Sequence, residues 1–245
     1  MATNLEAKQA LARKLDINYS DISNNDLFTD ADLQAYINTA CRQAWDYSAW
    51  DFKEHSKTAT LTSTNITNGY ISHPEDIAPS SIEFLVIDGD TFDKKEFKSY
   101  KRWFEKYPTS TEKYWAEFKR LVFFNTNLAT AGDVIDIYGM KTFTPLSADA
   151  DLLPFSPDED NAEYSGNDAI IRLAYAEALS SDKLQNVNQA EVERKAGFAT
   201  LAILDSNLKQ GRASEQSKDR PMFTVPDYFR GKTGRGDSPI GTFNS

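Results

Sequence analysis

The sequence has one cysteine and no long apolar run, and each scarcity excludes a class of protein. The single thiol of Cys41 cannot form an intramolecular disulfide or a zinc site made of cysteines alone. No apolar stretch approaches the ~18 residues that a membrane-spanning helix needs. The start of the chain lacks the basic and then apolar layout of a secretion signal. We therefore expect a protein that is made in a cytoplasm and stays outside membranes.

Basic residues are also scarce, since 27 Lys and Arg stand against 37 Asp and Glu, for a formal net charge of −10. A general nucleic-acid binder needs cations to displace phosphate counterions, so this charge argues against one. An acidic surface repels DNA, which suits a protein past which DNA slides without adhering. With 245 residues, 40% of them hydrophobic, the chain can nevertheless bury a substantial core.

Motifs for catalysis, metal binding and nucleotide binding are incomplete. Gly231-Lys232-Thr233 matches the end of a phosphate-binding loop, but the earlier glycine and the preceding strand are missing. The acids at 149, 151 and 158–160 lack the spacing of a calcium loop, and we interpret them as a solvated loop that caps the following helix. We predict no catalytic residue, no metal and no cofactor. The remote alternative is a carboxylate-dependent hydrolase that uses Asp149 and Asp151 with His73.

Apolar periodicity and capping signals predict the helices. Their ranges are 5–15, 30–49, 166–180 and 187–208. Thr29 or Asp30 can cap the second helix, and Gly211 is a stop signal after the fourth. The last two helices are rich in alanine, which allows them to approach closely. Cys41 lies on the apolar face of the second helix, where we expect a buried, unreactive thiol.

Between these helices, residues 57–140 predict a β-rich region with an insertion at 92–119. Alternating and apolar runs predict strands over residues 58–62, 69–72, 82–87, 115–124 and 134–138. Asp88-Gly89-Asp90 predicts a tight hairpin turn after the third of these strands. Residues 97–107 interleave aromatic and basic side chains. Such a pattern can stack on single-stranded bases, but we favour a helix or loop that packs on the sheet or on a neighbouring subunit.

The fold class predicted is α+β: N-terminal helices, a central antiparallel β-sheet with an insertion, a C-terminal Ala-rich helix pair and an extended C-terminal tail. The domain boundaries expected are a core at 1–210 and a tail at 211–245. The tail is polar with scattered apolar anchors and lacks the periodic apolar surface needed to fold alone. We predict that it docks on a partner chain. The predicted partner-binding residues are Met222, Phe223, Val225, Tyr228, Phe229, Arg230, Ile240 and Phe243.

Several segments, in their order along the chain, resemble the tailed-bacteriophage head-to-tail adaptor family, also called connector or head-completion proteins. Residues 27–38, LFTDADLQAYIN, look like the opening helix of these proteins. The strand at 134–138, the stretch TPLSADADLLP at 144–154 and the Ala-rich helix pair resemble the closing half of the family. The similarity extends roughly from Asp26 to Leu208. The insertion and the tail depart from the smallest members.

The resemblance implies a structural virion protein, not an enzyme, that forms a ring, usually a dodecamer, beneath the portal. Such a ring extends the channel for DNA ejection and provides the face to which the tail attaches. The implied partners are the portal protein, neighbouring copies of the chain, and tail or nozzle proteins. DNA is expected to pass through the channel without specific binding, and no membrane is involved. The implied location is the virion neck, and another neck or tail-completion protein is the structural alternative.

Overall fold

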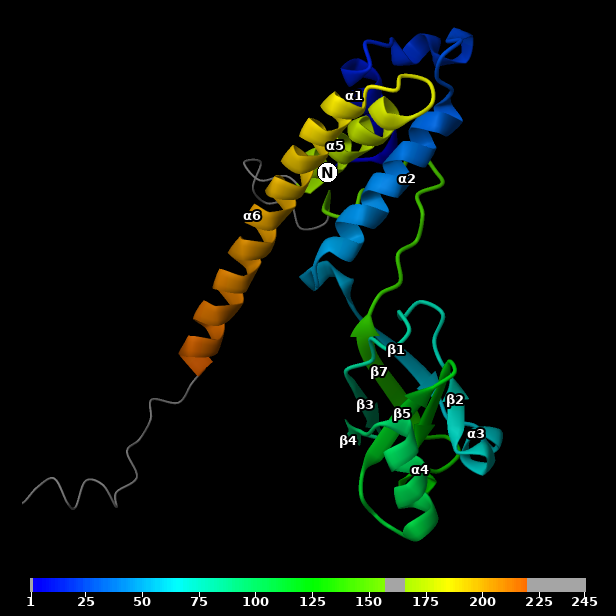
Figure 1. The fold of residues 1–245 in the computed structure, drawn as a ribbon. Helices are drawn as coiled ribbons and strands as arrows, with labels where there is room; N and C mark the ends of the chain where they lie inside the picture. The colour runs from blue at the N-terminus through cyan, green and yellow to red at the C-terminus, as the bar shows by residue number, and fades with distance from the viewer. Residues whose placement is uncertain (1, 157–165, 220–245) are drawn as a thin grey trace, which may run out of the picture. The chain divides into compact units, whose positions relative to one another are not determined.

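The computed structural model describes residues 2–156 and 166–219. The chain divides into two compact units, with the boundary between Leu201 and Ala202. The fold class is α+β, as predicted, because helices and a seven-stranded sheet are both present in the first unit (Figure 1). Within the described residues, no helix is long and apolar enough to cross a membrane.

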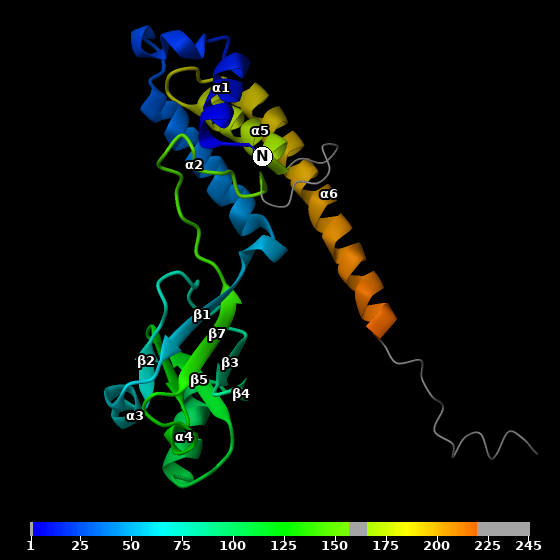
Figure 2. The ribbon, with the colours of Figure 1, turned by 180° about the vertical axis from the view of Figure 1, so that it is seen from behind.

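The main helices match the predicted ranges closely at their starts. They are α1 (Asn4–Lys14), α2 (Asp30–Tyr47), α5 (Gly166–Ser180) and α6 (Val187–Asp219). Capping boxes start α1 at Thr3 and α2 at Thr29, because each threonine side chain accepts a hydrogen bond from the backbone N–H three residues later. Helix α2 packs against both α1 and α5, and these helices lie side by side in both views (Figures 1 and 2).

The helix stop predicted at Gly211 is wrong, because α6 continues to Asp219. One glycine costs a helix only about 1 kcal/mol relative to alanine, and the first proline after it is Pro221. The predicted tail at 211–245 therefore begins with helix, and its remaining residues lie outside those that the structure describes.

Small residues allow α5 and α6 to approach closely, as the sequence predicted. Helix α5 buries Ala169, Ala174, Ala176 and Ala178 completely. A Cβ atom added at Gly197 of α6 would lie 2.9 Å from the side chain of Leu173. Two ion pairs, Arg172–Glu193 and Arg194–Glu177, join the same two helices beside this contact.

The sheet has the order β1-β7-β3-β4-β5-β6-β2. Its strands are β1 (Glu54–Thr60), β2 (Tyr70–Ser72), β3 (Phe84–Ile87), β4 (Asp90–Lys94), β5 (Tyr114–Phe118), β6 (Leu121–Phe124) and β7 (Val134–Met140). The expectation of a purely antiparallel sheet is wrong, since β4 and β5 are parallel. The helix α4 (Phe97–Lys106) lies between them in sequence, and such a crossover brings the chain back in the same direction.

Two hairpins have two-residue loops, and only one was predicted. Asp88 and Gly89 join β3 to β4 with φ of 48° and 82°, which confirms the predicted turn. The single strand expected at 115–124 is instead a hairpin, in which Lys119 and Arg120 join β5 to β6 with φ of 49° and 60°. Neither residue is a glycine or asparagine, the usual signals for a turn with two positive φ values, so the sequence gives no local sign of it.

A short helix, α3 (Ser63–Asn68), connects β1 to β2. Gly69 ends it in the left-handed conformation, with φ of 75°. The apolar core of the sheet comes only from residues between Leu61 and Ile137, with Phe92, Trp115 and Phe124 among the largest buried side chains. The chain enters and leaves this sheet at neighbouring points, because Lys141 N donates a hydrogen bond of 2.6 Å to Lys53 O.

Candidate functional site

The predicted partner-binding residues all lie outside the described residues. They are Met222, Phe223, Val225, Tyr228, Phe229, Arg230, Ile240 and Phe243. The candidate sites that the structure can define are therefore charged clusters and surfaces of the first unit.

The residues of the hydrolase alternative lie in separate environments. Asp149 forms an ion pair with Lys8 of α1, at 2.7 Å. Asp151 accepts hydrogen bonds from the backbone N–H groups of Ser147 and Ala148, which lowers the pKa of its carboxyl group. The side chain of His73 is completely buried, so its ring is inaccessible to a substrate in this conformation. Within the described residues, no group of acids, histidines and cysteine could hold a metal ion.

The described part of the acidic loop caps α1, a contact that was not predicted. The backbone N–H groups of Asn4 and Leu5 donate to the carbonyl oxygens of Asp151 and Asp149, at 2.8 and 3.0 Å. These groups belong to the first turn of α1, where helix N–H groups have no partner within the helix. The described part of the loop therefore caps the first helix of the chain, and the residues that lead into α5 lie outside those that the structure describes.

Lys8 links this loop to α2. Its ammonium group lies 2.9 Å from Asp30 and 2.7 Å from Asp149, with only 5% of the side chain exposed. Burial alone lowers the pKa of Lys8, but hydrogen bonds to Asp149 and Asp30 outweigh it and raise the pKa. Tyr19 donates a further hydrogen bond of 2.6 Å to Asp30. Lys8 therefore stays protonated, and its two ion pairs join α1, the start of α2 and the acidic loop.

Cys41 shows no sign of reactivity. It is fully buried on α2, and burial raises the pKa of its thiol to about 12. A thiol with such a pKa has almost no thiolate at neutral pH, and the thiolate is the nucleophile. The expected burial of Cys41 is confirmed.

A buried polar cluster connects β5 to the loop after β2. His73 Nδ1 donates to the carbonyl oxygen of Pro74 at 2.8 Å, and its Nε2 lies 3.4 Å from Glu117 Oε1. The same carboxylate oxygen accepts a hydrogen bond from Ser80 N at 2.7 Å. Lys94 reaches the other side of this cluster and donates to the carbonyl oxygen of Ile82 at 2.7 Å. The cluster fixes a long loop against the sheet.

A hollow of about 300 Å³ opens on strands β1, β3 and β7. Among its lining residues are Glu54, His55, Glu83, Phe84 and Tyr138. The rings of Phe84 and Tyr138 stack with centroids 4.3 Å apart, and Phe84 is 40% exposed. We call this the acidic hollow. Sequence analysis missed it because three strands distant in sequence contribute to it.

His55 is held at the edge of the acidic hollow by a neighbouring carboxylate. Its Nε2 lies 3.2 Å from Asp76 Oδ2, and Lys57 Nζ lies 3.1 Å from the same oxygen. Burial raises the pKa of Asp76, but the hydrogen bonds from Lys57 and His55 lower it by more. The opposite charges of Asp76 and Lys57 thus neutralise each other beside the hollow.

The interleaved aromatic and basic segment forms the amphipathic helix α4. Its aromatic side chains face the sheet: Phe97 stacks on Phe118 at 4.2 Å and Trp103 contacts Tyr114 edge-on at 4.9 Å. Tyr100 is 5% exposed. The interpretation as an aromatic helix packed on the sheet is confirmed, and these rings are engaged in packing.

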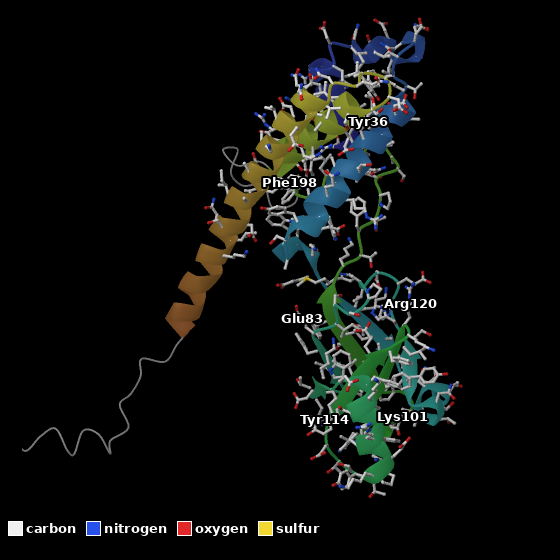
Figure 3. All side chains as sticks on the ribbon, in the orientation of Figure 1. Tyr36, Glu83, Lys101, Tyr114, Arg120 and Phe198 are labelled. Carbon is white, nitrogen blue, oxygen red and sulfur yellow. The ribbon has the colours of Figure 1, made fainter. Side chains whose placement is uncertain are left out.

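The basic side chains of the same region form an exposed surface, visible around Lys101 and Arg120 in Figure 3. Within the described residues they make no ion pair, and they come from α4 and from the β5–β6 turn: Lys98, Lys101, Arg102, Lys119 and Arg120. We call this set the basic flank. Residues 94–120 contain nine Lys and Arg and four Asp and Glu, whereas residues 58–93 contain six acids and no Lys or Arg. The stretch 94–120 is therefore basic and the stretch 58–93 acidic.

A scan against protein-family models and a search of the curated proteins found no match to this chain.

Proposed function

We propose that the protein is a structural virion component, a head-to-tail adaptor that forms a ring beneath the portal and presents the attachment face for the tail. The observation that carries this proposal is the order of the segments that resemble the adaptor family. The opening segment forms α2, the closing strand forms β7, and the Ala-rich pair forms α5 and α6. A β-rich insertion lies between the opening and closing halves.

Charge supports the same proposal. A net charge of −10 for each copy, repeated around a ring, makes a strongly negative collar. Such a collar repels the phosphate backbone, so DNA passes through with little adhesion. The close α5–α6 contact at Gly197 is the kind of small-residue packing that a bundle around a channel requires. Location in the virion neck, and assembly with portal and tail or nozzle proteins, belong to this proposal.

The proposal is tested by removing the residues after Asp219. The truncated chain keeps all the described helices and strands, so we expect an unchanged thermal unfolding transition and loss of co-sedimentation with portal rings. A full-length variant with alanine at Met222, Phe223, Tyr228 and Phe229 is the matched control for chain length, and it should lose binding as well. Unimpaired co-sedimentation of both variants would contradict docking of the tail on the portal.

Crosslinking in assembled particles separates this proposal from its structural alternative. Crosslinks from this chain to the portal protein support an adaptor. Crosslinks to tail proteins alone indicate a tail-completion protein instead.

A further inference from the structure

We infer that neighbouring copies of this chain bind each other through their sheets, with the basic flank of one copy contacting the acidic hollow of the next. The inference deepens the proposed function, because it rests on the ring for its biological setting. The charges, exposure and geometry of a single chain support the contact itself.

The basic flank is not explained by the stability of its own helix. Lys98 lies in the first turn of α4, which has no acidic residue, although the helix dipole favours acids there. Lys98 and Arg102 are four residues apart on the exposed side of the helix, a spacing at which like charges repel. These cations lower the stability of the helix and have no ion-pair partner among the described residues. They are therefore available to bind an anionic surface of another molecule.

The β5–β6 turn extends the basic flank with two more cations. Lys119 and Arg120 are both exposed, and both adopt a left-handed conformation that is costly for residues other than glycine. The stack of Phe97 on Phe118 places the start of α4 beside this turn. A helix and a hairpin therefore both contribute exposed cations to the flank.

The acidic hollow has the chemistry to receive an arginine side chain. Glu54 and Glu83 provide carboxylates at its lining, and Glu83 is exposed and forms no ion pair among the described residues. The stacked rings of Phe84 and Tyr138 offer the aromatic surface on which a guanidinium group stacks. Its volume of about 300 Å³ is at the small end of ligand pockets, a size that suits one inserted side chain.

One copy does not join these two surfaces to each other. Among the described residues, no ion pair joins Glu83 of the hollow to Arg120 or to the other cations of the flank. In the view of Figure 3, Glu83 lies toward the left of the sheet, and Arg120 and Lys101 lie toward the right. A contact between two different surfaces is heterologous, and repetition of it produces a closed ring or a filament.

A nucleic acid is the other anionic occupant to consider for the basic flank. The aromatic side chains of α4 are packed against the sheet, so they are not available to stack on bases. The rest of the chain is strongly acidic, which repels a long polyanion. The acidic surface of a second copy is therefore the favoured occupant.

Two charge reversals test the contact, Arg120→Glu and Glu83→Lys, with self-association measured by sedimentation velocity at low and at high salt. Each single variant should weaken association at least about tenfold, because it places like charges together across the interface. An equimolar mixture of the two variants, and the double variant, should recover association. In the mixture and in the double variant, residue 120 of one copy can face residue 83 of the next with the opposite charge.

The matched controls reverse an exposed charge elsewhere, through Arg13→Glu and Asp26→Lys, each with the same change in net charge. Both controls should associate like the wild type. All variants alter exposed side chains, and thermal unfolding of each verifies that it is folded. A wild type that stays monomeric, singles that match the controls, or a mixture that does not recover would each overturn the inference.

A third measurement tests the nucleic-acid alternative with a double-stranded DNA oligonucleotide. If Arg120→Glu abolished DNA binding and left self-association unchanged, the basic flank would be assigned to DNA and the inference would be overturned. Self-association requires no portal, so this outcome is separable from the proposed function. Copies that assemble with the expected exchange behaviour but never co-sediment with portal rings would support the contact and contradict the adaptor role.

Discussion

Asp32 shows how much one side chain contributes at the start of a helix. Its carboxylate accepts hydrogen bonds from the backbone N–H and the hydroxyl group of Thr29, at 2.8 and 2.7 Å. It also forms an ion pair with Lys183, which precedes α6, so it ties α2 to the α5–α6 connection. The hydrogen bond from Lys183, followed by those from Thr29, lowers the pKa of Asp32 to about 2.

The substitution Asp32→Asn should lower the free energy of unfolding at neutral pH by about 1–2 kcal/mol. A carboxyl group whose pKa is lower in the folded chain stabilises the fold above its unfolded pKa. That contribution is lost as the pH falls from about 4 to about 2, so the wild type should lose more stability over this interval than the variant. Urea unfolding at pH 7 and through the acid range measures both effects.

The control for this prediction is Asp26→Asn, which removes an exposed carboxylate without an ion pair among the described residues. It should change neither the stability at pH 7 nor the acid sensitivity. Equal acid sensitivity of Asp32→Asn and the wild type would contradict the role of Asp32.

At the scale of an element, the β5–β6 hairpin accepts an unfavourable turn. Lys119 and Arg120 both have positive φ, where asparagine and glycine are the favoured residues. The flanking strands compensate for this cost, since Trp115, Val122 and Phe124 of the hairpin are fully buried in the sheet core. The hairpin therefore forms because of its packing and not because of its turn.

The double substitution Lys119→Asn with Arg120→Gly should raise the free energy of unfolding by about 1–2 kcal/mol, because it relieves two left-handed residues. Urea unfolding measures the gain. Replacement of both residues by glutamine removes the same charges but keeps the strain, so it should give no gain. If the glutamine variant were stabilised equally, relief of charge repulsion and not of backbone strain would be the cause.

At the scale of the whole molecule, the sheet has the features of an inserted folding unit. Its apolar core draws only on residues from Leu61 to Ile137. Its two ends pair with each other, because Glu54 of β1 lies opposite Met140 of β7 and Lys141 is hydrogen-bonded to Lys53. Such a segment can be removed from a chain without separating the parts that it interrupts.

We expect the fragment 54–141 to fold alone, with cooperative unfolding reported by the fluorescence of its two tryptophans, Trp103 and the buried Trp115. The remaining helices, with this segment replaced by a short Gly-Ser linker, should keep their helical circular dichroism. A control fragment that starts at Leu61 and lacks β1 should be less stable, since β1 covers one edge of β7. A fragment 54–141 without a cooperative transition would show that the sheet depends on the helices.

The sequence alone predicted the features that local chemistry controls. Apolar periodicity located the starts of α1 and α2, the latter together with a cap at Thr29, and Asp88-Gly89 located one hairpin, because each signal depends on residues only a few positions apart. Tertiary structure decided the rest: the parallel β4–β5 pair, the Lys119-Arg120 turn, the cap that the acidic loop places on α1, and the acidic hollow. These features bring together segments distant along the chain, and their energy comes from burial and pairing that no local pattern encodes.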